Sequence, residues 1–258
     1  MLSSAALREA LGAPGGFWHD IRVVAETGST NADLLAEARS GLPEGAVLVA
    51  DAQSAGRGRL GRRWVSPPGT SLSFSVLLRP AAVPPASRAW VPLLAGVAVA
   101  AALRGEATAD AWLKWPNDVL VRGGKVAGIL AEQAGDAIVV GIGINVTVAR
   151  DELPAPGATS LAIEGAGTGR EALLTGVLGQ LERWYLDWRG EAGDADRCGL
   201  RAEYLGLCAT VGQQVRVSLP GGSVVTGEAS DVDSAGRLVV RSGAGPVPVS
   251  AGDVVHVR

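Results

Sequence analysis

Apolar residues recur along this chain with two different spacings, and these predict strands and helices in mixed order. Short runs rich in Val, Leu and Ile are typical of buried strands. Such runs occupy residues 20–26, 46–50, 71–79, 112–115, 118–121, 125–132 and 137–146. Apolar positions at helical spacing predict helices over residues 32–41, 90–103 and 171–188. The glycine pair Gly123-Gly124 predicts a hairpin between two of the strands.

The last fifth of the chain follows a different pattern. From Val211 onward, short Val-rich runs alternate with turns that contain glycine and proline, which is typical of a small β-barrel. We therefore predict a catalytic domain over 1–209 and a small β-barrel domain over 210–258, with a boundary that depends on composition alone. In the helix predicted over 171–188, we interpret the aromatic residues as core residues and not as contacts to a cofactor.

The composition indicates a globular chain whose attraction for anions must be local. Of the 258 residues, 47% are hydrophobic and 19% are charged, with a formal net charge of -3 and a pI of about 5.5. This length and apolarity suffice for one large core. Because the net charge is small and negative, binding to nucleic acid or to an anionic membrane surface is not expected, and an anion site must come from clustered residues.

Cysteine and histidine are too scarce for several common kinds of site. Cys198, Cys208, His19 and His256 cannot build a Cys/His zinc cluster or a disulfide framework, so we expect a reduced, cytoplasmic protein. The N-terminus has no basic segment followed by an apolar core. No apolar run reaches the ~18 to 20 residues of a spanning helix, so neither export nor membrane insertion is expected.

The segment DAQSAGRGRLGRRW at 51–64 concentrates positive charge between two predicted strands. Four arginines stand against Asp51, for a formal charge of +4 - 1 = +3. The interspersed glycines let backbone amides and guanidinium groups approach a polyphosphate from several sides. GRGRLG also fits the dinucleotide fingerprint, but that fingerprint opens a helix, whereas here Pro67-Pro68-Gly69 and a strand follow. Neither a Walker loop nor a G-x-S-x-G motif occurs. We interpret 51–64 as an anion-binding loop that is mobile until it is filled.

Lysine occurs at only two positions among the 23 basic residues, Lys114 and Lys125. An ammonium is a compact point charge and a guanidinium is a planar fork, so the retained lysines indicate lysine-specific roles. Both belong to one polar constellation, KWPND at 114–118 and GKVAGIL at 124–130. Lys, Asn and Asp around a turn fixed by Pro116 suit the binding of phosphate, ribose or a carboxylate near a hydrated magnesium ion.

Five motifs occur in the order seen in biotin protein ligases, and the chain resembles that family over roughly residues 26–145. The motifs are STN at 29–31, DAQSAGRGRLGRRW at 51–64, KWPNDVLV at 114–121, GGKVAGIL at 123–130 and GIGINV at 141–146. The resemblance implies an α+β fold in which a mixed, largely antiparallel sheet has flanking helices, as in class II synthetases. The Val-rich tail is similar to the small SH3-like β-barrel at the C-terminus of the same family.

The resemblance also implies a reaction in two steps. Biotin and ATP give biotinyl-5'-AMP and pyrophosphate, and a lysine of a biotin carboxyl carrier protein or domain, part of a biotin-dependent carboxylase, then takes the biotinyl group. ATP and Mg²⁺ would act as co-substrate and ion and biotin as substrate, with no tightly bound prosthetic group. The magnesium ligands cannot be named from the sequence, and neither nucleic acid nor membrane is an expected partner.

By the same likeness, the motif residues fall into three overlapping sets. The biotin and adenylate site would be lined by Ser29, Thr30, Asn31, Gln53, Gly56, Arg57, Gly58, Arg59, Lys125 and Gly128. The nucleotide would be contacted by Arg59, Arg62, Trp64, Lys114, Asn117 and Asn145, with Trp64 packed on adenine. The catalytic set would be Lys125, Arg57, Lys114 and Asp118.

The chemistry fits those residue types. A carboxylate that attacks phosphorus needs no general base, so the scarcity of histidine is no obstacle, and cations can supply the charge neutralisation. We expect Lys125 to hold the biotin carboxylate against the α-phosphate and Lys114 to contact phosphate. The second step needs an uncharged amine, for which Asp118 and bulk water are both open as the base.

Three other interpretations fit the sequence less well. A lipoate or octanoate ligase is similar in fold and in its acyl-transfer chemistry, but the GRGRLGRRW run favours biotin. Some biotin protein ligases also carry an N-terminal DNA-binding domain and act as repressors; here only 26 residues precede Thr27, and 20–26 already reads as a strand of the catalytic domain. A non-catalytic module with a basic loop would leave the placement of the lysines unexplained.

Overall fold

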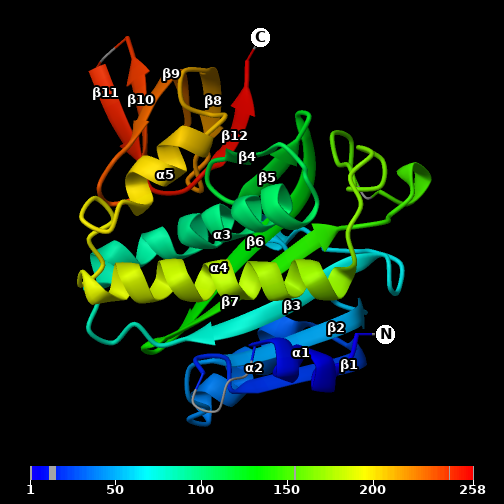
Figure 1. Ribbon diagram of the computed structural model, residues 1–258. Helices are drawn as coiled ribbons and strands as arrows, with labels where there is room; N and C mark the ends of the chain where they lie inside the picture. The colour runs from blue at the N-terminus through cyan, green and yellow to red at the C-terminus, as the bar shows by residue number, and fades with distance from the viewer. Residues whose placement is uncertain (1, 12–15, 154, 244, 258) are drawn as a thin grey trace.

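A seven-stranded mixed sheet forms the centre of the protein (Figure 1). The computed structural model describes residues 2–11, 16–153, 155–243 and 245–257. The strands are β1 (Asp20–Thr27), β2 (Ala46–Gln53), β3 (Ser71–Leu78), β4 (Ala111–Lys114), β5 (Asp118–Val121), β6 (Gly124–Ala134) and β7 (Ala137–Asn145). Their order in the sheet is β1-β2-β3-β7-β6-β5-β4. β1 and β2 pair in parallel and the other neighbours pair antiparallel, which confirms the predicted mixed, largely antiparallel sheet.

Helices cover both faces of this sheet. The helix α2 (Thr30–Arg39) buries Leu34 and Leu35 in a small cluster with Leu48 and Leu77 of the sheet. The helices α1 (Ser4–Leu11), α3 (Trp90–Glu106) and α4 (Arg170–Gly190) belong to the larger core cluster, which takes the alternate strand residues. Because successive strand side chains point to opposite faces, α2 lies on the face opposite α3 and α4. Short 3-10 helices occupy Arg59–Gly61, Pro85–Ala89 and Arg150–Glu152.

The helix α3 is apolar around its whole circumference because it is buried in the core. Together with the preceding turn it spans Pro85–Glu106, with a mean hydropathy of 1.6, and by length and composition it is able to cross a membrane. However, 67% of its most apolar window is buried inside the protein, against α4 and the sheet. Core packing therefore accounts for its apolarity.

The aromatic residues of α4 are core residues, as predicted. Tyr185 and Trp188 are fully buried and Trp184 is nearly so. The Tyr185 hydroxyl donates to Glu44 at 2.8 Å, and Arg189 pairs with the same carboxylate at 2.6 Å. Burial and the hydrogen bond to Glu44 raise the pKa of Tyr185 well above its usual value. This network ties α4 to the turn before β2.

A second, five-stranded antiparallel sheet follows the helix α5 (Leu200–Leu207). Its strands are β8 (Gln214–Ser218), β9 (Val224–Val232), β10 (Leu238–Ser242), β11 (Gly245–Val249) and β12 (Asp253–His256), in the order β11-β10-β9-β8-β12. Among the described residues no strand pairing joins β11 to β12, so the closed barrel stays a prediction. Two indoles of the central domain contact this sheet. Trp115 Nε1 donates to Gly236 O at 3.1 Å, and Trp90 Nε1 donates to Ser234 O at 2.7 Å.

The structure contains two helices that the sequence pattern did not predict, α1 and α5. The helix α1 buries only Leu7, so its eight residues carry too little periodic signal. The helix α5 is equally short and follows Gly199, whose positive φ of 78° ends the preceding turn. Both α1 and β1 pack into the domain of the seven-stranded sheet, so residues 2–11 and 16–27 form no separate helix-turn-helix unit.

Candidate active site

The basic loop between β2 and β3 folds back on itself. Gly58 N donates to Arg62 O at 2.7 Å and Trp64 N donates to Gly56 O at 2.9 Å. At its tip, Leu60 has a positive φ of 56° and its side chain is exposed. A side chain at Gly56 would overlap the Trp64 carbonyl, which explains the glycine at that position. The loop is therefore a compact hairpin that carries its arginines on several sides.

The indole of Trp64 packs against two glycines of adjacent strands, Gly128 and Gly143, which we call the glycine floor. A Cβ at Gly143 of β7 would overlap the indole ring, and a Cβ at Gly128 of β6 would lie 3.3 Å from both Trp64 and Lys125 Nζ. Trp64 Nε1 is buried and has no hydrogen-bond partner among the described residues. Two of the predicted site residues, Trp64 and Lys125, thus meet over the same floor.

The polar residues at the start of α2 meet Gln53 at the end of β2. Ser29 caps the helix by accepting from Ala32 N at 3.4 Å. Thr30 N donates to Gln53 Oε1 at 2.9 Å. The sequence placed 29–31 before the helix, whereas Thr30 and Asn31 are its first two residues, so their side chains are held by the helix as well as by these bonds.

The second constellation forms around the turn between β4 and β5. Lys125 Nζ lies 2.6 Å from Asp118 Oδ1, and Asn117 Oδ1 accepts from Arg59 Nη1 at 2.8 Å. Burial lowers the pKa of Arg59, while the charges of Asp118 and Asp253 act in the opposite direction. The loop arginine Arg59 therefore reaches the KWPND turn, and the two motifs form one site.

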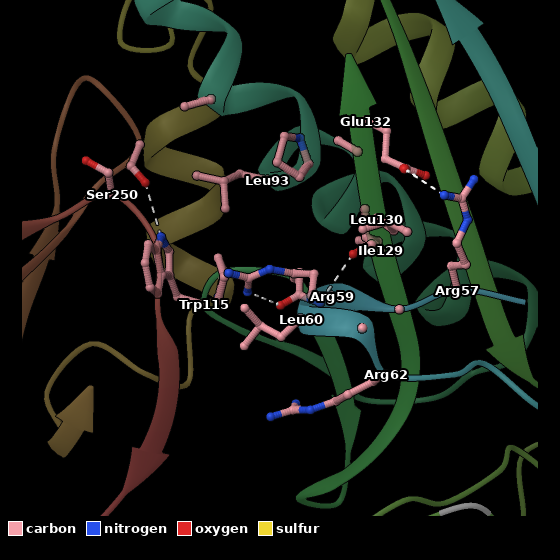
Figure 2. Close-up of a pocket in the computed structure, with 18 of the residues that line it drawn as sticks. Arg57, Arg59, Leu60, Arg62, Leu93, Trp115, Ile129, Leu130, Glu132 and Ser250 are labelled. Carbon is pink, nitrogen blue, oxygen red and sulfur yellow. Dashed lines mark hydrogen bonds and ion pairs between the residues drawn. The ribbon is translucent and has the colours of Figure 1, made fainter. Parts of the chain in front are cut away.

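A cavity of about 1090 Å³ lies between this loop and the C-terminal sheet (Figure 2). Figure 2 shows Arg57 beside Glu132 at one end, and Arg59 and Leu60 between β6 and Trp115. The wall combines the loop, the start of α3, the 115–117 turn and the middle of β6 with residues 235–237 and 250 of the C-terminal sheet. Turns of the C-terminal sheet are thus part of the cavity wall, a role that the sequence analysis did not predict.

Three predicted nucleotide contacts have other partners in this structure. Arg62 Nη2 is 2.5 Å from Asp253 Oδ2 in the C-terminal sheet, and this pair is largely exposed. Lys114 lies at the end of β4 near His256, where burial and then the Lys114 charge lower the pKa of that histidine. Asn145 Nδ2 donates to Thr159 O at 2.9 Å, and Thr159 N in turn donates to Lys125 O at 2.8 Å.

Four residues that the sequence did not single out belong to this site: Ser75, Glu132, Gly143 and Asp253. Ser75 lies among the site residues on β3, and its signal is the alternation SLSFS, where small hydroxyls replace apolar residues on one face of a buried strand. Glu132 pairs with Arg57 at 3.4 Å. Such contacts depend on strand register, which the sequence does not state.

The described charged side chains of the site form separate ion pairs between one basic and one acidic residue. They are not grouped as the ligands of a metal ion. Among the described residues, no group of three or more His, Cys, Asp and Glu side chains is placed to hold a metal ion. Mg²⁺ usually binds through one or two carboxylates together with substrate phosphates and water, so such a cage is not required for a nucleotide-bound ion. Asp118, at the edge of the site, is the carboxylate nearest to Lys125.

The chain is similar to known proteins over nearly its whole length. The model of the biotin/lipoate A/B protein ligase family matches residues 23–148, and that of the biotin protein ligase C-terminal domain matches residues 210–257. A biotin-acetyl-CoA-carboxylase ligase of Mycobacterium tuberculosis is 46% identical, covering 100% of this chain and 96% of that protein. One from Paracoccus denitrificans is 35% identical over 90% of this chain and 98% of its own length. This chain belongs to the biotin protein ligase family.

A solved structure agrees with that assignment. Biotin protein ligase from Aquifex aeolicus in complex with biotin and ATP has a TM-score of 0.76 and is 30% identical to this chain. The match covers 93% of this chain and 99% of the other. It includes both the mixed sheet and the C-terminal sheet, so the two parts of the molecule recur together.

Proposed function

We propose that this protein activates biotin with ATP to biotinyl-5'-AMP, releasing pyrophosphate, and then transfers biotin to a lysine of a biotin carboxyl carrier domain. One observation carries the proposal: the basic loop lays Trp64 on the glycine floor beside Lys125, and its Arg59 reaches Asn117. A nucleotide ring, an α-phosphate and a carboxylate need these three kinds of group close together. The relatives and the Aquifex aeolicus complex support the same substrates.

The first step is a displacement at phosphorus. A biotin carboxylate oxygen forms a bond to the α-phosphorus of ATP, the bond to the bridging oxygen breaks, and pyrophosphate leaves with that electron pair. No proton moves, so the protein must hold two anions together and neutralise them. Lys125 supplies a point charge and Arg57 and Arg59 supply planar forks around it. Lys125 would exchange its present partner Asp118 for the substrate anions.

The second step moves the acyl group. The uncharged amine of a carrier lysine attacks the acyl carbon, the amide bond forms, and AMP leaves with the electron pair of the bond to oxygen, while the amine nitrogen gives up one proton to the departing phosphate or to water. The ammonium proton must first go to a base. Asp118, at 2.6 Å from Lys125, is one candidate and bulk water is the other. A carboxylase carrier domain is the proposed partner, in line with the name of the Mycobacterium tuberculosis relative.

We also propose a cytoplasmic location. Cys198 and Cys208 are free thiols in the structure, which suits a reducing compartment. ATP, the proposed co-substrate, is plentiful there. Magnesium is proposed as the ion that accompanies ATP, without assigned protein ligands, and the proposed reaction needs no tightly bound prosthetic group.

Pyrophosphate release without any acceptor tests the first step. We expect purified protein to release pyrophosphate when biotin and MgATP are both present, because adenylation precedes transfer. Lipoate and octanoate, measured side by side, are expected to give little release. Release that depends on lipoate or octanoate and not on biotin would contradict the proposal, as would the absence of substrate-dependent release with all three acids.

A further inference from the structure

A continuous chain of hydrogen bonds, which ends in an ion pair, links the end of β2 to the first arm of the basic loop through the interior of the domain. Its members come from the end of β2, the start of α2, β3, β6 and the basic loop: Gln53, Thr30, Ser75, Asn31, Glu132 and Arg57. Gln53 and Arg57 are only four positions apart in sequence, so the chain nearly closes a ring. Its buried middle has no solvent to replace a missing partner, since Ser75 is 0% exposed.

The orientation of Asn31 fixes the direction of this chain. Asn31 Nδ2 faces Leu130 O at 3.2 Å and Glu132 Oε2 at 2.8 Å. Both partners are acceptors, so only the amide NH₂ can face them. Asn31 Oδ1 therefore faces inward, 2.6 Å from Ser75 Oγ and against Gly141, where a side chain would overlap it. A carbonyl oxygen cannot donate, so the Ser75 hydroxyl must donate to Asn31.

The next bond then has only one polarity. Thr30 Oγ1 lies 2.7 Å from Ser75 Oγ, and the Ser75 proton is already directed at Asn31. Thr30 must therefore be the donor in this bond. Its alternative acceptor, Gln53 Oε1, is farther away at 3.2 Å and already receives the Thr30 backbone N–H at 2.9 Å. The single hydroxyl proton of Thr30 points to Ser75, which leaves the lone pairs of Thr30 as acceptors.

We infer that Ser75 is a positioning residue for substrate recognition, which turns the Thr30 hydroxyl into a fixed acceptor for an N–H group of the ligand. The inference rests on the proposed function. The cyclic urea of biotin offers N–H donors, whereas the dithiolane of lipoate and the alkyl chain of octanoate offer none. A hydroxyl whose proton is held elsewhere accepts such a donor without reorientation, and it has nothing to gain from an apolar acid.

Glu132 fixes one end of this hydrogen-bond chain. Its carboxylate fixes the Asn31 amide through one oxygen and pairs with Arg57 through the other at 3.4 Å. Its side chain is 26% exposed at the cavity wall, so it connects the buried hydroxyls to the arginine of the loop. A change at Glu132 would therefore disturb both the direction of the chain and the position of Arg57.

A double-mutant cycle between Ser75 and Thr30 tests the inference. Steady-state pyrophosphate release is measured for the wild type, Ser75→Ala, Thr30→Val and the double variant, with biotin and ATP each varied and with hydroxylamine at a fixed concentration as the nucleophile that cleaves the adenylate and frees the enzyme for the next turnover. We expect Ser75→Ala and Thr30→Val each to raise the KM for biotin about tenfold, the effect of one hydrogen bond of ordinary net strength, with kcat and the KM for ATP nearly unchanged. In the Thr30→Val background, Ser75→Ala should add at most about a twofold rise, because it acts through the missing hydroxyl.

The matched control is Ser160→Ala. Ser160 is also 0% exposed, and its hydroxyl donates to Val148 O at 2.8 Å. We expect this control to lower the melting temperature without raising the KM for biotin. If Ser75→Ala does not fold, Ser75→Cys, with a similar volume and a weaker donor, takes its place in the cycle.

Each outcome separates the inference from the proposed function. An active wild type in which the Ser75 effect is equally large with and without the Thr30 hydroxyl would overturn the inference alone. So would an unchanged KM for biotin in either single variant. If the wild type shows no biotin-dependent release, the proposed function and the inference fall together.

Discussion

Lys125 shows how much depends on the kind of charge at one position. It is one of two lysines in a chain that otherwise uses arginine, and its ammonium lies 2.6 Å from Asp118 and beside Gly128. A glycine at 128 leaves room for the ammonium against the strand. A planar guanidinium is wider and directs its hydrogen bonds in a fork, so it would not fit the same space.

The first residue prediction concerns this difference. Lys125→Arg is expected to lower the rate of biotin-dependent pyrophosphate release by at least about a hundredfold, a loss typical of a misplaced electrostatic group. Stopped reactions with radiolabelled ATP would measure it. Lys114→Arg is the matched comparison, because Lys114 is a register partner of Asp118 and its charge acts on His256, whereas the ion pair with Asp118 is formed by Lys125. Equal rates for Lys125→Arg and the wild type would exclude the proposed role of Lys125.

The sequence also sets clear limits at this scale. The motifs contained Lys125, Asp118, Arg59 and Trp64, and the structure brings these together. Ser75 and Glu132 were missed because their roles arise from the register of β3, β6 and α2. Nor does the sequence show that Arg62 turns to Asp253 instead of a nucleotide-facing position. Side-chain contacts that arise from tertiary packing cannot be predicted from the spacing of residues along the chain.

At the scale of elements, the basic loop is held in place by partners from other parts of the chain. Arg59 bonds to Asn117 and Arg62 pairs with Asp253 at 2.5 Å, so the loop is tied to the β4–β5 turn and to the C-terminal sheet. Both loop ends are firm as well: Gly69 N donates to Asp51 O, and Asp51 forms a mostly buried pair with Arg170 at 2.7 Å. For the loop to open, the contacts of Arg59 and Arg62 near its tip must therefore break.

An element-level prediction follows from the exposed pair. Asp253→Asn should speed limited tryptic cleavage after Arg57 to Arg63 by about two- to fivefold, because a solvent-exposed ion pair contributes little. Gel or mass-spectrometric time courses would measure this. Glu191→Gln, which removes the exposed Arg197 pair elsewhere, is the control and should leave loop cleavage unchanged. Unchanged cleavage in Asp253→Asn would show that the pair does not restrain the loop.

The bounds of the long helices and strands were more predictable from the sequence than the presence of short helices. The strands over 71–79 and 137–146 and the helix over 171–188 agree with β3, β7 and α4 to within about two residues, because each carries a long apolar pattern. The eight-residue helices α1 and α5 were missed, since neither extends over enough turns to show a period.

At the scale of the whole molecule, Trp90, Trp115, Thr210 and His256 form the contact between the two sheets, which we call the joint. His256 Nε2 lies 3.2 Å from Thr210 Oγ1, whose hydroxyl also receives Trp115 N at 3.1 Å. Burial, and then the charge of Lys114, lower the pKa of His256 below its usual 6.5. The folded state therefore binds a proton less readily at this site than the unfolded chain does.

This joint predicts a pH dependence of stability. The contribution of neutral His256 is complete above about pH 6.5 and is lost as the pH falls below that value toward the lowered folded pKa, because the unfolded chain then binds more protons. Melting temperatures between about pH 8 and pH 5 should therefore fall less steeply in His256→Gln than in the wild type. Parallel curves for the two proteins would show that His256 does not couple the joint to pH.

Because lysine is scarce, the protein offers few amines of its own to the acyl-adenylate that it is proposed to make. An acyl-adenylate reacts with any neutral amine that it meets, and under the proposed function this protein makes such a compound beside its own surface. The 21 arginines that accompany the two lysines keep the charge of the chain but offer no acylable amine. Lys125 Nζ is engaged in an ion pair with Asp118 at 2.6 Å. The chain thus carries almost no side chain that could be labelled in place of the carrier lysine.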